Sequence, residues 1–216
     1  MTREDVRTRI EQSGIIPAIR VLNAEDAMFA ANAVFDGGIL VAELTMTIPG
    51  APDVIRELVK RNPEAAVGAG TVLDVETARR CLDAGASFLT STGLDGDMVA
   101  FAEKHKIAVI PGALTPTEVM IAHKAGVDFV KIFPCAQVGG PAYIKALKAP
   151  FPHVPMIASG GVNQQTAGDF IHAGAIALGI GEDLIPRDAI ENRDLDWIRE
   201  LCRRFQKIVK RAREPK

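Results

Sequence analysis

The feature that most constrains the fold is a regular alternation of short apolar runs with longer amphipathic stretches along the 216-residue chain. Strand-then-helix alternation predicts a parallel sheet with helical crossovers, and eight such units after an N-terminal helix predict a single-domain (β/α)8 TIM barrel of the α/β class. The predicted strands are Ile15–Val21, Leu40–Thr45, Ala65–Thr71, Phe88–Ser91, Ala108–Pro111, Phe129–Phe133, Met156–Ser159 and Ile176–Gly179. Helical spacing is found in Ala24–Phe35, Pro52–Lys60, Val75–Asp83, Thr117–Lys124 and Gln164–His172.

A weak internal repeat sets the register of four strands. Four helices end in small-residue turns whose last glycine suits the left-handed conformation that stops a helix. Five residues beyond these glycines stand Glu43, Thr90, Lys131 and Gly179, in predicted strands two, four, six and eight. Alternate strands of a barrel share an interior layer, so we expect the first three to point into one layer and Gly179 to leave space beside them. The turns are Asp36-Gly37-Gly38, Asp83-Ala84-Gly85, Lys124-Ala125-Gly126 and His172-Ala173-Gly174.

Lys131 is the lysine of greatest chemical interest, because it lies in an apolar run between Phe129 and Pro134. Burying an ammonium group is costly, and lysine in such surroundings tends to lose its proton. A neutral amine can add to a carbonyl and form a Schiff base. The register alone leaves open a purely structural ion pair with Glu43, but the gap at Gly179 and the polar strand ends favour chemistry.

Residues suited to a ligand gather where the predicted strands end, the edge at which barrel active sites lie. Arg20 ends the first strand, and its guanidinium suits a carboxylate or phosphate, although an ion pair with Glu25 or Asp26 would also explain it. Thr71 offers a hydroxyl at the end of the third strand. Glycine allows close approach of backbone N–H groups, and two glycine-rich ends stand where many barrels bind phosphate. They are Ser159-Gly160-Gly161 and Gly179-Ile180-Gly181.

Composition excludes several classes of protein. Hydrophobic residues make up 48% and charged residues 24% of the chain, with a net charge of −2, as in ordinary globular proteins. The basic stretch Lys207 to Lys216 suits a solvated helix end, so we expect no nucleic-acid partner. The three cysteines and four histidines lack disulfide or metal-ligand spacing, so we expect no cofactor and no metal. Without a signal-like start or a long apolar stretch, we expect no membrane partner and a cytoplasmic location.

Several motifs together resemble the 2-keto-3-deoxy-6-phosphogluconate (KDPG) aldolase family, which includes the 6-phosphogalactonate and 4-hydroxy-2-oxoglutarate aldolases. The resemblance spans about Gly14 to Pro186. It rests on Ile16-Pro17-Ala18-Ile19-Arg20, Glu43-Leu44-Thr45, Gly68-Ala69-Gly70-Thr71-Val72-Leu73, Pro111-Gly112, Thr115-Pro116-Thr117-Glu118, Lys131-Ile132-Phe133-Pro134 and Gly160-Gly161-Val162.

The resemblance implies a metal-free, homotrimeric class I aldolase whose small-molecule substrate is a 2-keto-3-deoxy-6-phospho sugar acid. It would be cleaved to pyruvate and glyceraldehyde 3-phosphate. Lys131 falls on the Schiff-base lysine, Glu43 on the general acid/base and Thr71 on the threonine that contacts pyruvate. The predicted substrate-binding residues are Arg20, Thr47, Thr71, Pro111, Phe133, Ser159, Gly160, Gly161, Gly181 and Glu182.

Three departures from the family pattern bear on the substrate. Thr47 stands where the phosphogluconate branch usually has an arginine, so the galactonate branch is closer, since it has an arginine matching Arg20. Ser91-Thr92-Gly93 replaces a Ser-Pro or Thr-Pro step. Glu182 replaces a serine of the phosphate loop, and a like-charge pair at ~4 Å and an effective dielectric near 20 costs on the order of 4 kcal/mol.

Two alternatives follow from these departures. The first is an aldolase for an unphosphorylated 2-keto acid such as 4-hydroxy-2-oxoglutarate, favoured by Glu182. The second is a non-catalytic sugar-acid-binding barrel, against which stand both Lys131 and Glu43.

Overall fold

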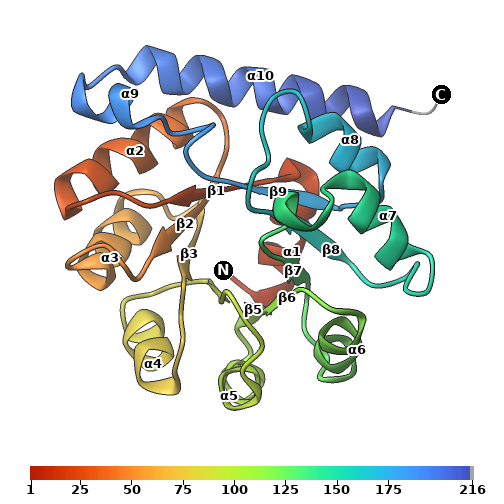
Figure 1. Ribbon diagram of the computed structural model, residues 1–216. Coiled ribbons are helices and arrows are strands. Elements are labelled where there is room, and N and C mark those ends of the chain that lie inside the picture. Colours follow the sequence, from red (N-terminus) through yellow and green to blue (C-terminus); the bar gives the residue numbers. More distant parts are fainter. Residues whose placement is uncertain (215–216) are drawn as a thin grey trace.

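The computed structural model describes residues 1–214, and its parallel strands form a ring surrounded by helices (Figure 1). The hydrogen-bonded order is β5-β4-β3-β2-β1-β9-β8-β7-β6, with every neighbouring pair parallel. The predicted α/β barrel is therefore confirmed. The strands are β1 Ile15–Ile19, β2 Val41–Thr45, β3 Ala66–Gly70, β4 Phe88–Thr90, β5 Ala108–Ile110, β6 Gly112–Ala113, β7 Val130–Ile132, β8 Met156–Ser159 and β9 Ala177–Ile180.

The fifth strand of the barrel differs from the prediction, because Pro111 divides it into β5 and β6. β5 pairs with β4, whereas β6 pairs with β7, so the chain changes partner at the proline and closes the ring. Proline has no N–H to donate to a ladder, which makes it a natural break in a strand. Its carbonyl still accepts a hydrogen bond from the backbone N–H of Lys131, at 2.9 Å.

The glycine turns that set the register behave as predicted. Gly38, Gly85, Gly126 and Gly174 have φ angles of 88°, 95°, 78° and 106°, all in the left-handed region that glycine tolerates. Each follows a helix and precedes a strand of the ring, so the repeat aligns the strands as well as stopping the helices.

The helices begin where side chains cap their free N–H groups. Asn23 accepts a hydrogen bond from the N–H of Asp26 at the start of α2, and Thr115 forms a capping box with Glu118 at the start of α6. The helical elements are α1 Arg3–Ser13, α2 Ala24–Asp36, α3 Ala51–Arg61, α4 Val75–Asp83, α5 Gly96–His105, α6 Pro116–Lys124, the 3-10 turn η1 Ala136–Val138, α7 Pro141–Lys148, α8 Ala167–His172, α9 Arg187–Glu191 and α10 Leu195–Arg213.

The predicted N-terminal helix, α1, packs against β1, β2, β5 and β9 at the end of the barrel where the strands begin. Val6 and Ile10 on α1 are completely buried. Arg3 Nε lies 2.7 Å from Asp128 Oδ1, and the other oxygen of Asp128 accepts a hydrogen bond from the N–H of Val109 at 2.9 Å. α1 therefore closes this end, and the opposite end stays available for a ligand.

The C-terminal helix, α10, lies outside α2 and α8 along one side of the barrel (Figure 1). Ile198, Leu201, Cys202, Phe205 and Val209 on its inner face are buried, as expected of a surface helix with one apolar stripe. Within residues 1–214, none of the helices is both long and apolar enough to cross a membrane.

Candidate active site

Lys131 and Glu43 meet in the interior of the barrel. They lie on β7 and β2, which are separated in the ring by β1, β8 and β9. Lys131 Nζ is 3.5 Å from each carboxylate oxygen of Glu43, and the two side chains are 8% and 4% exposed. Side chains from such distant strands touch only if both point inward, so the shared layer predicted from the repeat is confirmed for this pair.

Gly70 on β3 makes room for the carboxylate of Glu43. A Cβ atom at Gly70 would collide with the Oε1, Cδ and Cγ atoms of Glu43, and one at Gly68 would collide with the ring of Phe88. Glycine at a strand end can also allow close backbone approach to a ligand. Here both glycines leave space for interior side chains instead, and the carboxylate of Glu43 lies directly over β3.

The pair is buried but loosely coupled. A distance of 3.5 Å is at the outer limit of a hydrogen bond, so the amine is close to the carboxylate without being locked to it. Lys131 Nζ also lies 5.7 Å from the ring centroid of Phe133, within cation–π range. The half-buried ring of Phe133 therefore borders the amine on a second side.

The space expected beside Gly179 is not open, and that prediction was wrong. A Cβ at Gly179 would lie 2.6 Å from Ser159 Oγ, because the serine side chain of β8 extends over the glycine of β9. Ser159 is 5% exposed. The glycine therefore brings a hydroxyl group into the interior rather than a void.

Arg20 and Thr71 come together just beyond the ends of β1 and β3. Arg20 Nη2 donates to Thr71 Oγ1 at 3.3 Å. The alternative ion pair of Arg20 with Glu25 or Asp26 is wrong, because Arg193 binds both carboxylates at 2.8 Å. Arg20 is exposed and keeps its charge available for an anion.

Thr71 has a φ of 57°, which is unusual for a β-branched residue. Such strain is found mainly where the surrounding structure holds a residue for function, and here it accompanies the hydroxyl that contacts Arg20. The strain was not visible in the sequence, since Thr71 had the pattern of an ordinary strand residue.

Thr47 is held by a chain of hydroxyl groups. Thr45 Oγ1 donates to the carbonyl of Ile19 at 3.1 Å, and its oxygen lies 2.9 Å from Thr47 Oγ1. A hydroxyl has one proton, so Thr47 must be the donor to Thr45. In this arrangement Thr47 offers only acceptor lone pairs to a ligand, whereas the guanidinium of Arg20 offers N–H donors that suit a carboxylate.

The predicted glycine turn after β8 packs against the segment that follows β7. Gly160 and Gly161 have φ angles of 87° and 80°. A Cβ at Gly160 would lie 3.0 Å from Pro134 Cα, and one at Gly161 would collide with Ala136 Cβ. The carbonyl of Gly160 accepts from the N–H of Ala136 at 3.0 Å. The turn therefore lies next to Phe133, and larger residues would push these segments apart.

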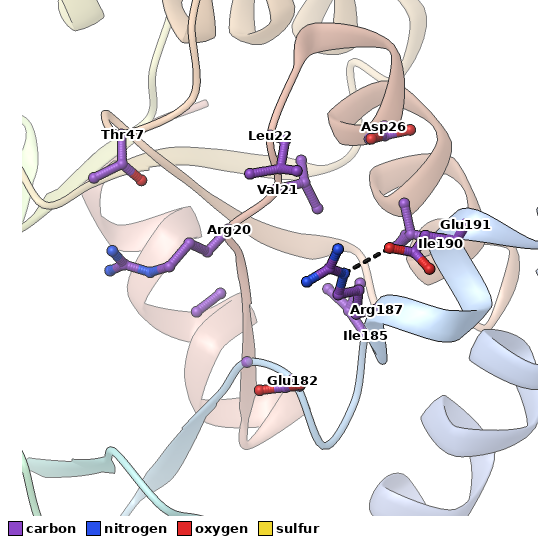
Figure 2. Close-up of a pocket in the computed structure, with 12 residues that line it drawn as sticks. Arg20, Val21, Leu22, Asp26, Thr47, Glu182, Ile185, Arg187, Ile190 and Glu191 are labelled. Carbon is purple, nitrogen blue, oxygen red and sulfur yellow. Dashed lines mark hydrogen bonds and ion pairs between the residues drawn. The ribbon is translucent and has the colours of Figure 1, made fainter.

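A cavity of about 580 Å³ opens beside the carboxyl ends of β1 and β9 (Figure 2). Four predicted site residues line it, namely Arg20, Thr47, Gly181 and Glu182. Lys131 and Glu43 are not in its lining. The remaining wall comes from β1, the segment that joins it to α2, the first turn of α2, and the loop and helix after β9. It consists of Ala18, Val21, Leu22, Asp26, Ile185, Arg187, Ile190 and Glu191.

The charged groups of this cavity, here named the far pocket, differ in whether they are paired. Arg187 Nε is 2.6 Å from Glu191 Oε1, so these two charges are paired. Figure 2 shows the guanidinium of Arg20 pointing toward the side of Thr47, away from that pair. Glu182 is exposed on the loop after β9. Burial, together with the neighbouring charge of Glu182, raises the pKa of Asp183, which indicates a locally negative loop.

Sequence reasoning missed Gly70 and Arg187. The spacing of Gly68 and Gly70, two residues apart on one strand face, was the available signal for the first. Arg187 had no signal, because the stretch after Pro186 has the polar pattern of a surface helix.

A (β/α)8 barrel with a lysine amine and a carboxylate paired across its interior defines a class of enzyme in which a buried amine does the chemistry. The family model described as "Aldolase: KDPG and KHG aldolase" matches residues 6–201. The chain therefore belongs to the KDPG and KHG aldolase family, and it is a carbon–carbon lyase. The non-catalytic barrel that the sequence left open does not agree with this membership.

Similar proteins agree with the family and the fold. The chain is 35% identical to the KHG/KDPG aldolase of Escherichia coli (strain K12) over 189 residues, covering 88% of this chain and 89% of the relative. A KDPG aldolase of Legionella pneumophila, solved with pyruvate captured at low pH as a covalent carbinolamine intermediate, is 32% identical with a TM-score of 0.85. That match covers 91% of this chain and 96% of the other.

A second similar structure is a cube-shaped, highly porous protein cage designed by fusing symmetric oligomeric domains. It is 28% identical with a TM-score of 0.81, over 91% of this chain and 72% of the cage chain.

Proposed function

We propose that this protein cleaves KDPG into pyruvate and glyceraldehyde 3-phosphate by a class I mechanism with Lys131 as the nucleophile. The observation that carries the proposal is the buried amine of Lys131, 3.5 Å from both oxygens of Glu43 in the barrel interior. The relative from Escherichia coli is named for both acids, whereas that from Legionella pneumophila is named for KDPG alone, which supports KDPG as the substrate.

The substrate binds with its 2-keto carbon next to Lys131 Nζ and its carboxylate toward Arg20. The guanidinium of Arg20 makes no ion pair within residues 1–214, and Thr71 holds it at the strand ends through the 3.3 Å hydrogen bond. Arginine suits a carboxylate because its planar N–H groups can donate two parallel hydrogen bonds.

Imine formation begins when the ammonium group of Lys131 passes one proton to Glu43 and the neutral amine attacks C2 of the substrate. The nitrogen loses a proton, the carbonyl oxygen gains one, and the resulting hydroxyl leaves as water with a second proton. Glu43 is the group within reach that can accept and return these protons. The product is a protonated Schiff base on Lys131.

Bond cleavage uses the protonated imine as an electron sink. Glu43, acting through a water molecule, takes the proton of the C4 hydroxyl. The C3–C4 bond breaks, its electrons pass to the imine to form an enamine, and glyceraldehyde 3-phosphate leaves. Glu43 then returns a proton to C3, and hydrolysis of the imine releases pyruvate.

The aromatic ring of Phe133, 5.7 Å from Lys131 Nζ, covers one side of the imine. Ser159 places a hydroxyl near the same interior space. The carbonyl of Pro111 accepts a 2.9 Å hydrogen bond from the backbone N–H of Lys131, which fixes the position of Lys131 along the barrel axis. The phosphate end of the substrate extends toward Gly160, Gly161 and Gly181, where Glu182 can stay in solvent because it is exposed.

Borohydride reduction in the presence of pyruvate tests the covalent step. A reduced pyruvate adduct should appear on the peptide that contains Lys131, and it should be absent from Lys131→Met. Lys104→Met, which removes an exposed lysine on α5, is the matched control and should keep the adduct. An adduct on any other lysine, with Lys131 unmodified, would overturn the mechanism.

A second candidate substrate is the unphosphorylated 4-hydroxy-2-oxoglutarate. Glu182 in the far pocket favours it, since a carboxylate repels a phosphate dianion. Comparing kcat/KM for the two substrates decides between them. A strong preference for the phosphorylated acid would dismiss this candidate.

We further propose that the protein assembles as a homotrimer. The similarity to a chain of the designed cage, which was built from symmetric oligomeric domains, supports assembly into oligomers. The mass of the particle in solution, measured by light scattering, should be three times that of the 23.1 kDa chain. A monomer at micromolar concentration would contradict the proposal.

A further inference from the structure

Thr90, the last residue of β4, carries a buried hydroxyl whose partner is missing among residues 1–214. The residue is 1% exposed, and Oγ1 makes no hydrogen bond there. The next residue, Ser91, is satisfied, because its hydroxyl donates to the carbonyl of Gly93 and accepts from the N–H of Gly112. Buried hydroxyl groups are nearly always partnered, so an unpartnered one calls for an explanation.

The pleat of the sheet places Thr90 on the interior face beside Glu43. Residues two apart on a strand share a face, so Phe88 faces the same way as Thr90, and Gly68 the same way as Gly70. Phe88 pairs with Gly68 in the ladder, and its ring lies over that glycine. Leu89 pairs with Ala69, and continuing that register by one residue sets Thr90 level with Gly70, the glycine over which the carboxylate of Glu43 lies.

The carboxylate of Glu43 has room for further donors. Its hydrogen-bond partner within the described residues is Lys131 Nζ, at 3.5 Å from each oxygen. An ionised carboxylate has about four acceptor positions, so Glu43 can accept further hydrogen bonds. An unpartnered hydroxyl and an undersatisfied carboxylate therefore face the same buried interior from neighbouring parts of the barrel wall.

We propose that Thr90 is a positioning residue, whose hydroxyl holds the water molecule that carries protons between Glu43 and C3 of the enamine. The inference rests on the proposed function. In this step the water gives a proton to C3 and receives one from the carboxylic acid of Glu43. Thr90 neither gains nor loses a proton, and its hydrogen bond orients the water toward the reacting carbon.

The test is the exchange of the methyl protons of pyruvate in D2O, followed by NMR. This reaction needs the enamine and the proton transfer but no aldehyde. Thr90→Val, which keeps the shape and removes the hydroxyl, should slow exchange by about 10-fold or more, as expected for impaired acid–base transfer. Thr90→Ser, which restores the hydroxyl, should exchange within about threefold of the wild type. The KM for pyruvate should stay within about twofold in both.

Borohydride trapping of pyruvate on Lys131 separates the two proposals. Trapping should be unchanged in Thr90→Val if the hydroxyl acts on proton transfer alone. Failure of trapping in the wild-type enzyme would count against Lys131 itself, whatever Thr90 does.

A packing role is excluded by comparing Thr90→Ser with Thr90→Ala, which both lose the methyl group and differ only in the hydroxyl. This comparison also serves if Thr90→Val does not fold. Faster exchange in Thr90→Ser than in Thr90→Ala, by about 10-fold, supports the proposal. Equal exchange rates in the two variants would overturn it.

Discussion

The two ends of the substrate site differ in how firmly the protein defines them. At the interior end, Lys131 and Glu43 are nearly inaccessible, come from strands, and stand over a glycine that fits one of them. At the far pocket, Arg20 and Glu182 are exposed and follow strands, while Arg187 and Glu191 come from a short helix. The difference teaches that the proposed covalent step relies on buried strand residues, whereas the proposed substrate contacts rely on exposed residues of the loops.

Replacing the amine should give the largest effect. Lys131→Met should lower kcat by at least about 10⁴-fold, because no other described group can form the imine at that place. It should also lower the free energy of unfolding by on the order of 3 kcal/mol, since it leaves the carboxylate of Glu43 buried without its cation. Chemical denaturation measures the second effect.

The double variant Lys131→Met with Glu43→Gln is the control for stability. It removes both charges and should recover much of the lost free energy of unfolding while staying inactive. A fully active Lys131→Met enzyme would contradict the assignment of the covalent step to the buried interior of the barrel.

Replacing the free arginine should have an intermediate effect. Arg20→Gln should raise KM about 10- to 100-fold with a smaller change in kcat, because a hydrogen-bonded charge contact is worth about 1.5–3 kcal/mol. Arg187→Gln is the matched control, since Arg187 lines the same pocket but is paired with Glu191. Equal effects of the two variants in steady-state kinetics would show that pairing does not distinguish these arginines.

Removing the carboxylate of the far pocket should have a smaller effect. Glu182→Ser should raise kcat/KM for KDPG by up to about 10-fold at low salt, because solvent screens an exposed charge, and the gain should shrink as salt is added. Turnover of unphosphorylated 4-hydroxy-2-oxoglutarate should barely change. Glu191→Gln is the control for a general loss of negative charge. No change for KDPG at any ionic strength would place Glu182 away from the phosphate.

The smallest effect concerns pH. The pKa of Asp183 is raised above its ordinary value of 3.8, by burial and by the charge of Glu182. The folded state therefore binds this proton more tightly, and the stabilisation is lost as pH rises through the folded pKa. Asp183→Asn should thus raise the melting temperature slightly at pH 7 but not at pH 3. An equal shift at both pH values would mean that the charge is not the cause.

The sequence predicts the interior end of the site, with Glu43 and Lys131, because its geometry depends on local spacing along the chain. Strand register and helix stops depend on neighbouring residues, so the left-handed glycines and the meeting of Glu43 with Lys131 follow from local spacing. Both side chains are then buried because inward-pointing residues of a (β/α)8 barrel fill its interior.

The details that the sequence does not predict depend on side-chain direction or on distant contacts. Ser159 fills the space at Gly179 because of where its side chain points, and Thr71 has a positive φ that its residue type disfavours. The wall of the far pocket needs α9 to pack beside the start of α2, which no local pattern encodes. The roles of the predicted substrate-binding residues stay predictions until the variants are measured.

The break at Pro111 divides the ring into two arcs that meet there and at β1. The arc from β1 to β5 carries the carboxylate of Glu43, and the arc from β6 to β9 carries the amine of Lys131. The proposed acid/base and the proposed nucleophile therefore belong to different arcs of the ring. Neither arc holds both groups, so the pair of Glu43 and Lys131 forms only once the whole ring has folded.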